Sequence, residues 1–240
     1  MGWHLGRLAA FDIETTGVDT ELDRIVTAAV SFVGGGQPSE HLSWLVNPGI
    51  EIPAGATAVH GITTDQARAE GRIASEAVDE IAAALADQLR KGVPIIAFNA
   101  RFDLTILDRE AQRYGLRRLV DRVGGTDSML VVDPYVLDKH FDRFRRGKRT
   151  LSAVCEHYRV TLGQAHAANA DALAAARVAF RLGANVAELR DIDLKVLHRQ
   201  QVSWAAEQAA SLEDYFRQQG RNQPVERVWP VVPASLPRAA

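Results

Sequence analysis

The sequence predicts an α/β fold, a mixed sheet flanked by helices, from two patterns along the chain. Its first 46 residues contain three apolar runs joined by short turns, which indicates an antiparallel meander of strands. Beyond residue 77, apolar runs alternate with segments of helical periodicity, and this alternation implies right-handed crossovers that add parallel strands. We therefore expect one mixed sheet with helices packed on it.

The strands of the meander are expected where apolar or β-branched residues gather. Leu8 to Phe11 is a short apolar run, Ile25 to Val33 is rich in β-branched residues, and His41 to Val46 alternates apolar and polar side chains. Thr16-Gly17 and Gly34-Gly35-Gly36 lie between these runs and favour turns. The first part of the chain therefore predicts three consecutive strands.

The rest of the chain favours helices, with one compact apolar strand. Apolar residues recur every three or four positions from Ala77 to Leu89, and Gly92 supplies the usual C-terminal glycine. Val93 to Phe98 is expected to be a strand. Further helices are expected from about Leu104 to Ala111, from about Asp171 to Leu189, and from Val202 to Phe216, where Gly220 closes the last one.

Length and proline distribution divide the chain into three parts. A chain of 240 residues is near the upper size for one hydrophobic core, so one large domain or one domain with an appendage is expected. We assign residues 1–190 to that domain, residues 191–220 to a C-terminal helical extension and residues 221–240 to a proline-rich tail. Proline excludes a helix or a central strand from the tail, but Trp229 is expected to dock on the core.

Composition limits the classes of protein that fit. The apolar content is 47% and the formal net charge is −2, which excludes disorder along most of the chain and polyanion coating by bulk charge. Cys155 is the single cysteine, which excludes an intramolecular disulfide and favours a reducing compartment. No apolar run approaches the ~20 residues of a membrane span, and the first residues lack a signal-peptide layout. We therefore expect a cytoplasmic protein without a membrane partner.

The end of the first predicted strand carries a pair of acids. Asp12 and Glu14 are two residues apart, and this spacing puts both carboxylates on one face of a strand. Two like charges held together are unfavourable unless a cation or a proton neutralises them, so the pair is a candidate clamp for a divalent metal. Acid-x-acid patterns also arise by chance in a chain with 30 acids. The apolar run before Asp12 and the turn Thr15-Thr16-Gly17 strengthen the assignment.

Two further segments place acids at the ends of predicted elements. Asp103 follows the strand that ends at Phe98, and ligands of open α/β sheets gather at the carboxyl ends of strands. His166 precedes Asp171 by five residues, where a loop enters an Ala-rich helix, and could lie over a metal held by that aspartate. Each acid alone also fits a helix N-terminal carboxylate stabilised by the helix dipole, and His166 alone fits a solvated loop histidine.

Taken in order, these segments resemble the histidine-bearing, DnaQ-like branch of the DEDD 3′-5′ exonucleases, which includes polymerase proofreading subunits. The matching stretches are Phe11 to Gly17, Asn99 to Asp103 and His166 to Ala172. The resemblance spans about residues 7–187. It departs from the family at Phe98, where many relatives have histidine.

Two more stretches are similar to elements of that family. Ala58 to Thr63 is similar to the loop beside the terminal nucleotide. Thr126 to Leu130 resembles an Asp-Thr-Leu element, and within it we interpret Asp127 as structural rather than as a metal ligand.

The resemblance implies a ribonuclease H-like fold with a five-stranded mixed sheet, and a catalytic set of Asp12, Glu14, Asp103, His166 and Asp171. The four acids would hold two divalent cations, Mg²⁺ or Mn²⁺, which prefer oxygen ligands. His166 would be the general base that takes a proton from water, because imidazole titrates near neutrality. Substrate contacts are expected from Thr15, Thr16, Gly17, His60, Gly61, Ile62, Phe98, Asn99 and Phe102.

The resemblance also implies a substrate and a partner. The substrate would be the 3′ end of single-stranded or frayed DNA, which would be hydrolysed to nucleoside monophosphates. A DNA polymerase or another replication protein is the expected protein partner.

A basic segment supports a polyanionic substrate. Residues 101–150 carry a net charge of +4, against −6 for the remainder of the chain. The densest part includes Arg145, Arg146, Lys148 and Arg149, which could follow the phosphates of a single strand while Phe141 or Phe144 stacks on a base. A solvated loop without a ligand is the alternative interpretation.

Two classes of function remain open. The first is a metal-dependent exonuclease acting on DNA, with RNA as an alternative substrate. The second is a binding module of a replication assembly; Gln208 to Phe216 is loosely similar to a sliding-clamp peptide, although its periodicity fits a packed helix. The complete acidic set and His166 favour the enzyme.

Overall fold

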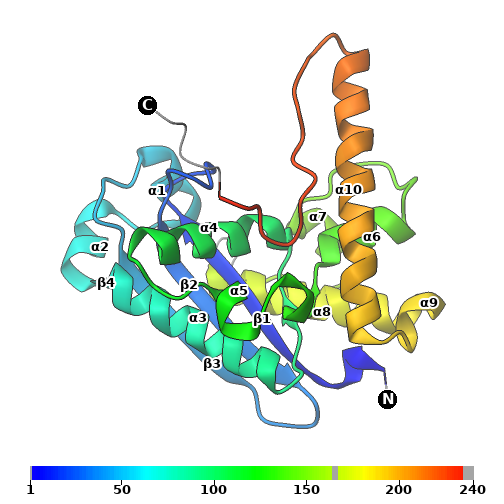
Figure 1. The fold of residues 1–240 in the computed structure, drawn as a ribbon, viewed down its shortest axis with the longest axis horizontal. Coiled ribbons are helices and arrows are strands. Elements are labelled where there is room, and N and C mark those ends of the chain that lie inside the picture. The colour runs from blue at the N-terminus through cyan, green and yellow to red at the C-terminus, as the bar shows by residue number, and fades with distance from the viewer. Residues whose placement is uncertain (1, 164–166, 235–240) are drawn as a thin grey trace.

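The computed structural model describes residues 2–163 and 167–234, and in these residues six strands form one mixed sheet in the order β4-β3-β2-β1-β5-β6 (Figure 1). The strands are β1 Arg7–Thr15, β2 Ile25–Gly34, β3 Glu40–Asn47, β4 Arg72–Ile73, β5 Ile95–Ile96 and β6 Val131–Val132. The helices are α1 Ala54–His60, α2 Thr64–Glu70, α3 Ala74–Arg90, α4 Ala100–Arg113, α5 Leu119–Val123, α6 Pro134–Phe141, α7 Leu151–His157, α8 Ala168–Asn185, α9 Ala187–Arg190 and α10 Leu194–Gln218.

The predicted α/β class is confirmed, but the described sheet has one strand more than the expected five. The extra strand, β4, consists of two residues that pair in parallel with Val46 and Asn47 of β3. Arg72 and Ile73 are both exposed, so no apolar pattern in the sequence indicates this strand.

β1 is the strand that positions the acidic pair. It pairs antiparallel with β2 along its length, but it pairs in parallel with β5 only at Ala9 and Ala10. β5 is shorter than the predicted strand from Val93 to Phe98, because the Val93 N–H donates to the Gln88 carbonyl at 3.0 Å and Pro94 has no N–H. The last residues of β1 therefore extend beyond β5, and this leaves room beside them for the start of α4.

Helices bury both faces of the sheet. On one face, α3 and α4 pack Ile81, Leu85 and Leu104 against Phe11 and Ile13 of β1. On the other face, α8 packs over β1 and β2. The predicted helix from Asp171 to Leu189 is divided, because α8 begins at Ala168 and ends at Asn185, and α9 follows it. The sheet is therefore the middle layer of the molecule.

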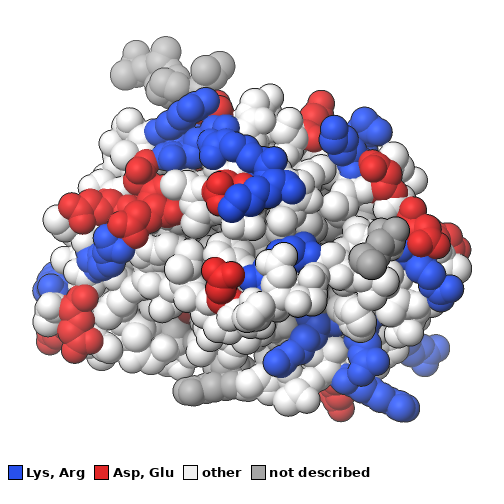
Figure 2. All heavy atoms as spheres, turned by 90° about the horizontal axis from the view of Figure 1, so that it is seen from below, with Lys and Arg blue, Asp and Glu red and all other residues white. Residues whose placement is uncertain are grey.

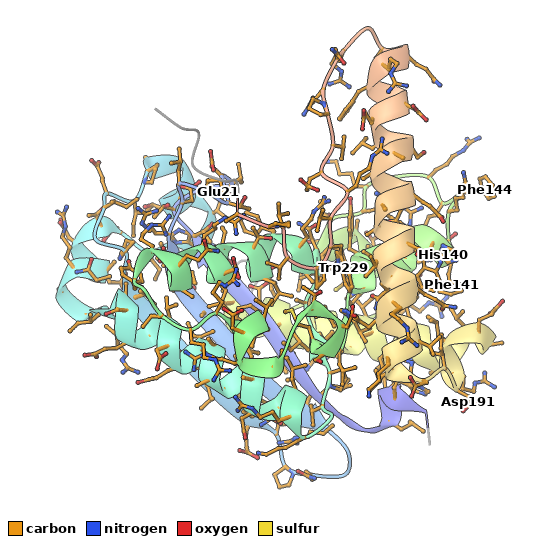
Figure 3. All side chains as sticks on the ribbon, viewed as in Figure 1. Glu21, His140, Phe141, Phe144, Asp191 and Trp229 are labelled. Atoms are coloured by element: carbon orange, nitrogen blue, oxygen red, sulfur yellow. The ribbon has the colours of Figure 1, made fainter. Side chains whose placement is uncertain are left out.

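The C-terminal helix α10 lies across the edge of the sheet beside β6 and α6. Its buried residues are Leu197, His198, Gln201, Ala205 and Ala209, and the helix end beyond them projects from the body (Figure 1). The chain then returns beside α10 and crosses α4, where Trp229 is buried with its ring turned into the body (Figure 3). The expected docking of Trp229 is therefore present.

The surface mixes charges of both signs. On the face in Figure 2, groups of Lys and Arg alternate with groups of Asp and Glu, in agreement with a net charge near zero. Within residues 2–163 and 167–234, no helix has both the length and the apolar character needed to cross a membrane.

Candidate active site

Three carboxylates meet where β1 approaches the start of α8. Asp12 and Glu14 lie on the same face of β1, and Asp171 belongs to the first turn of α8. Each offers one carboxylate oxygen, and these three oxygens lie within 4.8 Å of one another. The structure thus brings together three of the four predicted metal ligands in a group that could hold a cation.

Asp103, the fourth predicted ligand, stands beside this group. It belongs to the first turn of α4 and is buried, and its Oδ1 accepts a hydrogen bond from the Ile13 N–H at 3.2 Å. Asp103 lines the same pocket of about 460 Å³ as Asp12, Glu14 and Asp171. It is not one of the three residues whose oxygens cluster within 4.8 Å.

The electrostatics of this pocket favour either protons or a cation. Burial raises the pKa of Asp12 well above its ordinary value, and the negative charges of Asp103, Asp171 and Glu14 raise it further. Burial, followed by the charge of Asp171, raises the pKa of Glu14 to about 7. Burial also raises the pKa of Asp103, against hydrogen bonds from backbone N–H groups that lower it. A divalent cation would replace the protons that these carboxylates otherwise retain.

Aromatic and polar side chains form the walls of the pocket. Phe98, Asn99 and Phe102, three of the predicted substrate contacts, line it, and so do Tyr135, Arg149 and Thr150. The rings of Phe98 and Tyr135 meet edge to face with centroids 5.6 Å apart. Phe98 therefore stands on an aromatic wall of the pocket.

Asp133 supports the site without lining the carboxylate pocket, and the sequence reasoning missed it. It follows β6, is buried, and accepts hydrogen bonds of 2.9 Å from the N–H groups of Asn99, Ala100 and Tyr135. Asn99 has a φ of 63°, a left-handed conformation that asparagine tolerates better than most residues, and α4 begins directly after it. Asp133 thus holds the backbone at Asn99 and Ala100 and so sets the direction in which α4 begins. Its position at the carboxyl end of a strand was the signal that could have found it.

The turn after β1 uses its hydroxyl groups internally. The Thr15 hydroxyl donates to the Gly17 carbonyl at 2.6 Å, and the Thr16 hydroxyl donates to the Asp23 carboxylate at 2.7 Å. A Cβ at Gly17 would lie 2.5 Å from an oxygen of Asp23, so a larger residue here would displace the carboxylate that the Thr16 hydroxyl bonds. None of these three predicted substrate contacts is among the residues that line the carboxylate pocket. Their role in binding stays a prediction.

The predicted loop around His60 lines a different hollow. His60 and Ile62 border a pocket of about 310 Å³ with Trp44 of β3 and Asn169 of α8. The His60 Nδ1 accepts from the Ile62 N–H at 3.1 Å, and burial lowers the pKa of the His60 imidazole. Gly61 between them has a φ of 81°, which suits glycine. The structure therefore places this loop beside the carboxylate pocket rather than within it.

The basic segment divides into engaged and free side chains. Asp138 on α6 is buried and forms ion pairs with Arg145, at 2.7 Å, and with Arg149. The side chains of Arg145 and Arg149 are 12% and 15% exposed. Arg149 also lines the carboxylate pocket. Arg146 and Lys148 are exposed, and Phe144, 90% exposed, points away from the body (Figure 3). Phe141 instead packs against Trp204 of α10, with ring centroids 5.4 Å apart.

The remaining predicted catalytic residue, His166, lies outside the described residues, which resume at Ala167 just before α8. Its assignment as the general base stays a prediction.

The arrangement of strands and helices is similar to that of solved structures. E. coli exonuclease I in complex with a dT13 oligonucleotide matches with a TM-score of 0.63 and 19% identity, covering 77% of this chain and 42% of that one. Exonuclease I from Methylocaldum szegediense matches with a TM-score of 0.60 and 20% identity over the same shares of the two chains. These similarities identify the fold as ribonuclease H-like, as the sequence predicted.

Two of the sequence relatives carry the names of DNA polymerase III proteins. A DNA polymerase III subunit epsilon-like protein of Rhodobacter capsulatus is 42% identical over 109 residues, which cover 42% of this chain and 14% of that protein. A PolC-type DNA polymerase III of Listeria innocua is 25% identical over 183 residues, which cover 76% of this chain and 12% of that protein. This chain therefore spans a small part of the length of these relatives.

A protein-family model matches a longer part of the chain than the Rhodobacter capsulatus relative does. The RNase T family model, described as an exonuclease, matches residues 9–179, which include Asp12, Glu14, Asp103 and Asp171. The chain belongs to this exonuclease family, and the resemblance to DnaQ-like exonucleases is confirmed. The match ends within α8, so α9, α10 and the tail lie beyond it.

Proposed function

We propose that the protein is a divalent-metal-dependent 3′-5′ exonuclease that releases nucleoside monophosphates from single-stranded or frayed DNA ends. The observation that carries this proposal is the group of Asp12, Glu14 and Asp171 oxygens within 4.8 Å of one another. Membership of the exonuclease family and the DNA-related relatives support DNA as the substrate.

The donor set suits two Mg²⁺ or Mn²⁺ ions. Its members are all carboxylates, and hard divalent cations prefer oxygen ligands. Asp12, Glu14 and Asp171 would hold the cations, and Asp103 would assist directly or through water. When bound, the two cations would neutralise the charge that develops on the phosphate and on the leaving 3′ oxygen.

The chain's own residues would position the substrate and move a proton. Phe98 and Phe102 offer apolar surface in the pocket for the terminal nucleotide, and Arg149 offers a cation at its rim. His166 would take the proton of the attacking water, because an imidazole near its ordinary pKa is a base at neutral pH. A DNA polymerase or another replication protein is the partner that we propose, because two of the sequence relatives are polymerase III proteins.

The test is digestion of end-labelled single-stranded DNA, duplex DNA and RNA of matched sequence with Mg²⁺, followed by product sizing. We expect stepwise shortening of single-stranded DNA from the 3′ end, weaker attack on duplex, and no product in excess chelator. Asp12→Ala is the matched control. Its nuclease activity should fall by more than the ~10 to 100-fold that is typical when a residue that only orients a metal ligand is replaced. Preference for RNA would change the substrate, whereas tight binding without hydrolysis would favour the binding-module hypothesis.

A further inference from the structure

Two further hollows lie next to the carboxylate pocket on the side of α10. The second hollow, of about 440 Å³, is lined by α10 and by residues between Lys139 and Arg149, and the third, of about 70 Å³, shares lining residues with the other two. Arg149 lines the first and second hollows, Tyr135 lines the first and third, and Lys139 lines the second and third. These shared lining residues place the three hollows side by side, and we call the second and third hollows together the α10 groove.

Cations prevail along the α10 groove. Lys139 is half-buried, and no carboxylate among the described residues forms an ion pair with it; its Nζ lies 4.9 Å from the centre of the Tyr135 ring. Arg143 is exposed and lines the second hollow. Arg149 lines it too and forms an ion pair with Asp138. Glu207 is the single carboxylate that lines the second hollow, and Asp133, which accepts hydrogen bonds from backbone N–H groups, is the single one that lines the third. A concave surface with this excess of positive charge attracts a polyanion.

Aromatic rings alternate with these cations. His140 stacks on Trp204 with centroids 4.0 Å apart, and Tyr215 lies further along the same face of α10, 52% exposed (Figure 3 labels His140). Trp204, Gln208, Ser211 and Tyr215 follow one another by four, three and four positions, so they share one face of the helix. Cations interleaved with aromatic faces are the composition of grooves that bind single-stranded nucleic acid, because phosphates pair with the cations while bases stack.

We propose that the α10 groove binds the single strand upstream of the terminal nucleotide, so that α10, which lies beyond the family match, supplies the far part of the binding site. The proposal rests on the proposed nuclease function, because a strand whose 3′ end lies at the carboxylates would continue into the adjacent α10 groove. Burial lowers the pKa of Lys139, which agrees with a cation that lacks an anionic partner until a phosphate arrives.

The test compares binding of long and short strands in chelator, where no hydrolysis occurs. The double variant Arg143→Ala with Tyr215→Ala changes two exposed residues of the groove. Arg199→Ala removes a cation from the same helix; Arg199 is nine residues before Gln208, which puts it on about the opposite face of α10, and it does not line the groove. Fluorescence anisotropy then gives the Kd of labelled oligothymidylates of about 20 nucleotides, longer than the ~4 to 16-nucleotide range of single-strand sites, and of about four nucleotides, at its lower end.

We expect the double variant to bind the longer strand at least ~5-fold more weakly, which is the lower end of the effect of one lost base stack. Its slope of log affinity against log salt should fall by about 0.7 for one lost phosphate contact. The short strand and Arg199→Ala should keep wild-type values. Equal affinity and slope for the double variant and the wild type would overturn the proposal and favour an acidic peptide of a protein partner as the occupant.

A separate measurement tests the proposed nuclease function. Nucleotide release from the short strand with Mg²⁺ reports the carboxylate pocket alone. Absence of release by the wild type, with groove-dependent binding as expected, would overturn the nuclease and retain the groove as a strand-binding surface.

Discussion

The Asp103 carboxylate accepts a hydrogen bond of 3.2 Å from the backbone N–H of Ile13, the residue between Asp12 and Glu14. β5 pairs with β1 only as far as Ala10, so Asp103 takes the place of a strand neighbour for this part of β1. The bond joins the first turn of α4 to the strand that carries the acidic pair. Asp103 therefore has a structural role as well as its proposed role at the metal site.

Substitution of Asp103 should separate these two roles. Asp103→Asn keeps an oxygen for the Ile13 N–H and removes a buried charge, so we expect unchanged or higher stability with loss of nuclease activity. Asp103→Ala leaves that buried N–H without its partner and should cost about 1–3 kcal/mol. Thermal unfolding and nucleotide release, measured on both variants, check this. Equal stability of the two variants would mean that the bond to Ile13 contributes nothing.

Stability of the metal-free protein should fall as pH rises. The folded pKa of Glu14 is about 7, above its ordinary value of 4.5, so the folded state binds the proton more tightly than the unfolded state. The contribution is fully present below about pH 4.5 and is lost as pH rises through about 7. In chelator, Glu14→Gln should therefore gain in melting temperature relative to wild type across this window, by a few degrees for each ~1 kcal/mol.

Mg²⁺ supplies the control for this pH effect. Cation binding to the carboxylates should raise the melting temperature of the wild type more at pH 8 than at pH 5, since metal ligands must be deprotonated. The same Mg²⁺ effect in Asp12→Ala would show that the cation binds elsewhere.

Asp133 should matter for both stability and activity, although it lines no wall of the carboxylate pocket. Asp133→Ala removes the acceptor of three backbone N–H groups, and each buried group left unpaired costs about 1–3 kcal/mol. We also expect turnover to drop ~10 to 100-fold, as for other residues that orient metal ligands indirectly. Asp127→Ala, at an exposed acid, is the control and should change neither. Normal turnover of a folded Asp133→Ala protein would exclude the positioning role.

Substitutions in the basic segment should affect stability where the side chain is paired and DNA binding where it is exposed. Arg145→Ala breaks a charged hydrogen bond to buried Asp138 and should cost about 1.5–3 kcal/mol. Arg146→Ala and Lys148→Ala change exposed side chains, so stability should stay within about 0.5 kcal/mol. Each should lower the salt slope of single-strand binding by about 0.7 if its cation contacts a phosphate. Unchanged slopes would support the solvated-loop interpretation.

The parts of the fold predicted best are those that local periodicity controls. The strands around Phe11 and Ile25 follow from apolar runs, and the shared face of Asp12 and Glu14 follows from the period of a strand. β4 was not predictable in this way, because its residues are exposed, and the start of β5 depends on the hydrogen bond from Val93 to the Gln88 carbonyl, which an apolar run does not show.

The parts of the site that were missed depend on contacts between distant segments. Asp133 meets Asn99 across 34 positions, and Asp138 meets Arg149 through a buried ion pair, so neither role is visible in the sequence around the residue. The basic segment looked uniformly free for the same reason. Charge counts do not show which cations already have an internal partner.

His166 remains the decisive test of the proposed chemistry. If it is the general base, His166→Ala should lower turnover by ~10² to 10⁴ while the affinities for Mg²⁺ and DNA change little. Turnover of the wild type should rise with pH through a limb near the ordinary histidine pKa of ~6.5, and the variant should lose that limb. A solvated loop histidine predicts nearly normal turnover instead. Turnover against pH at saturating Mg²⁺ decides between them, and a variant that stays within about threefold of wild type, far less than the loss of a general base, would show that another group accepts the proton.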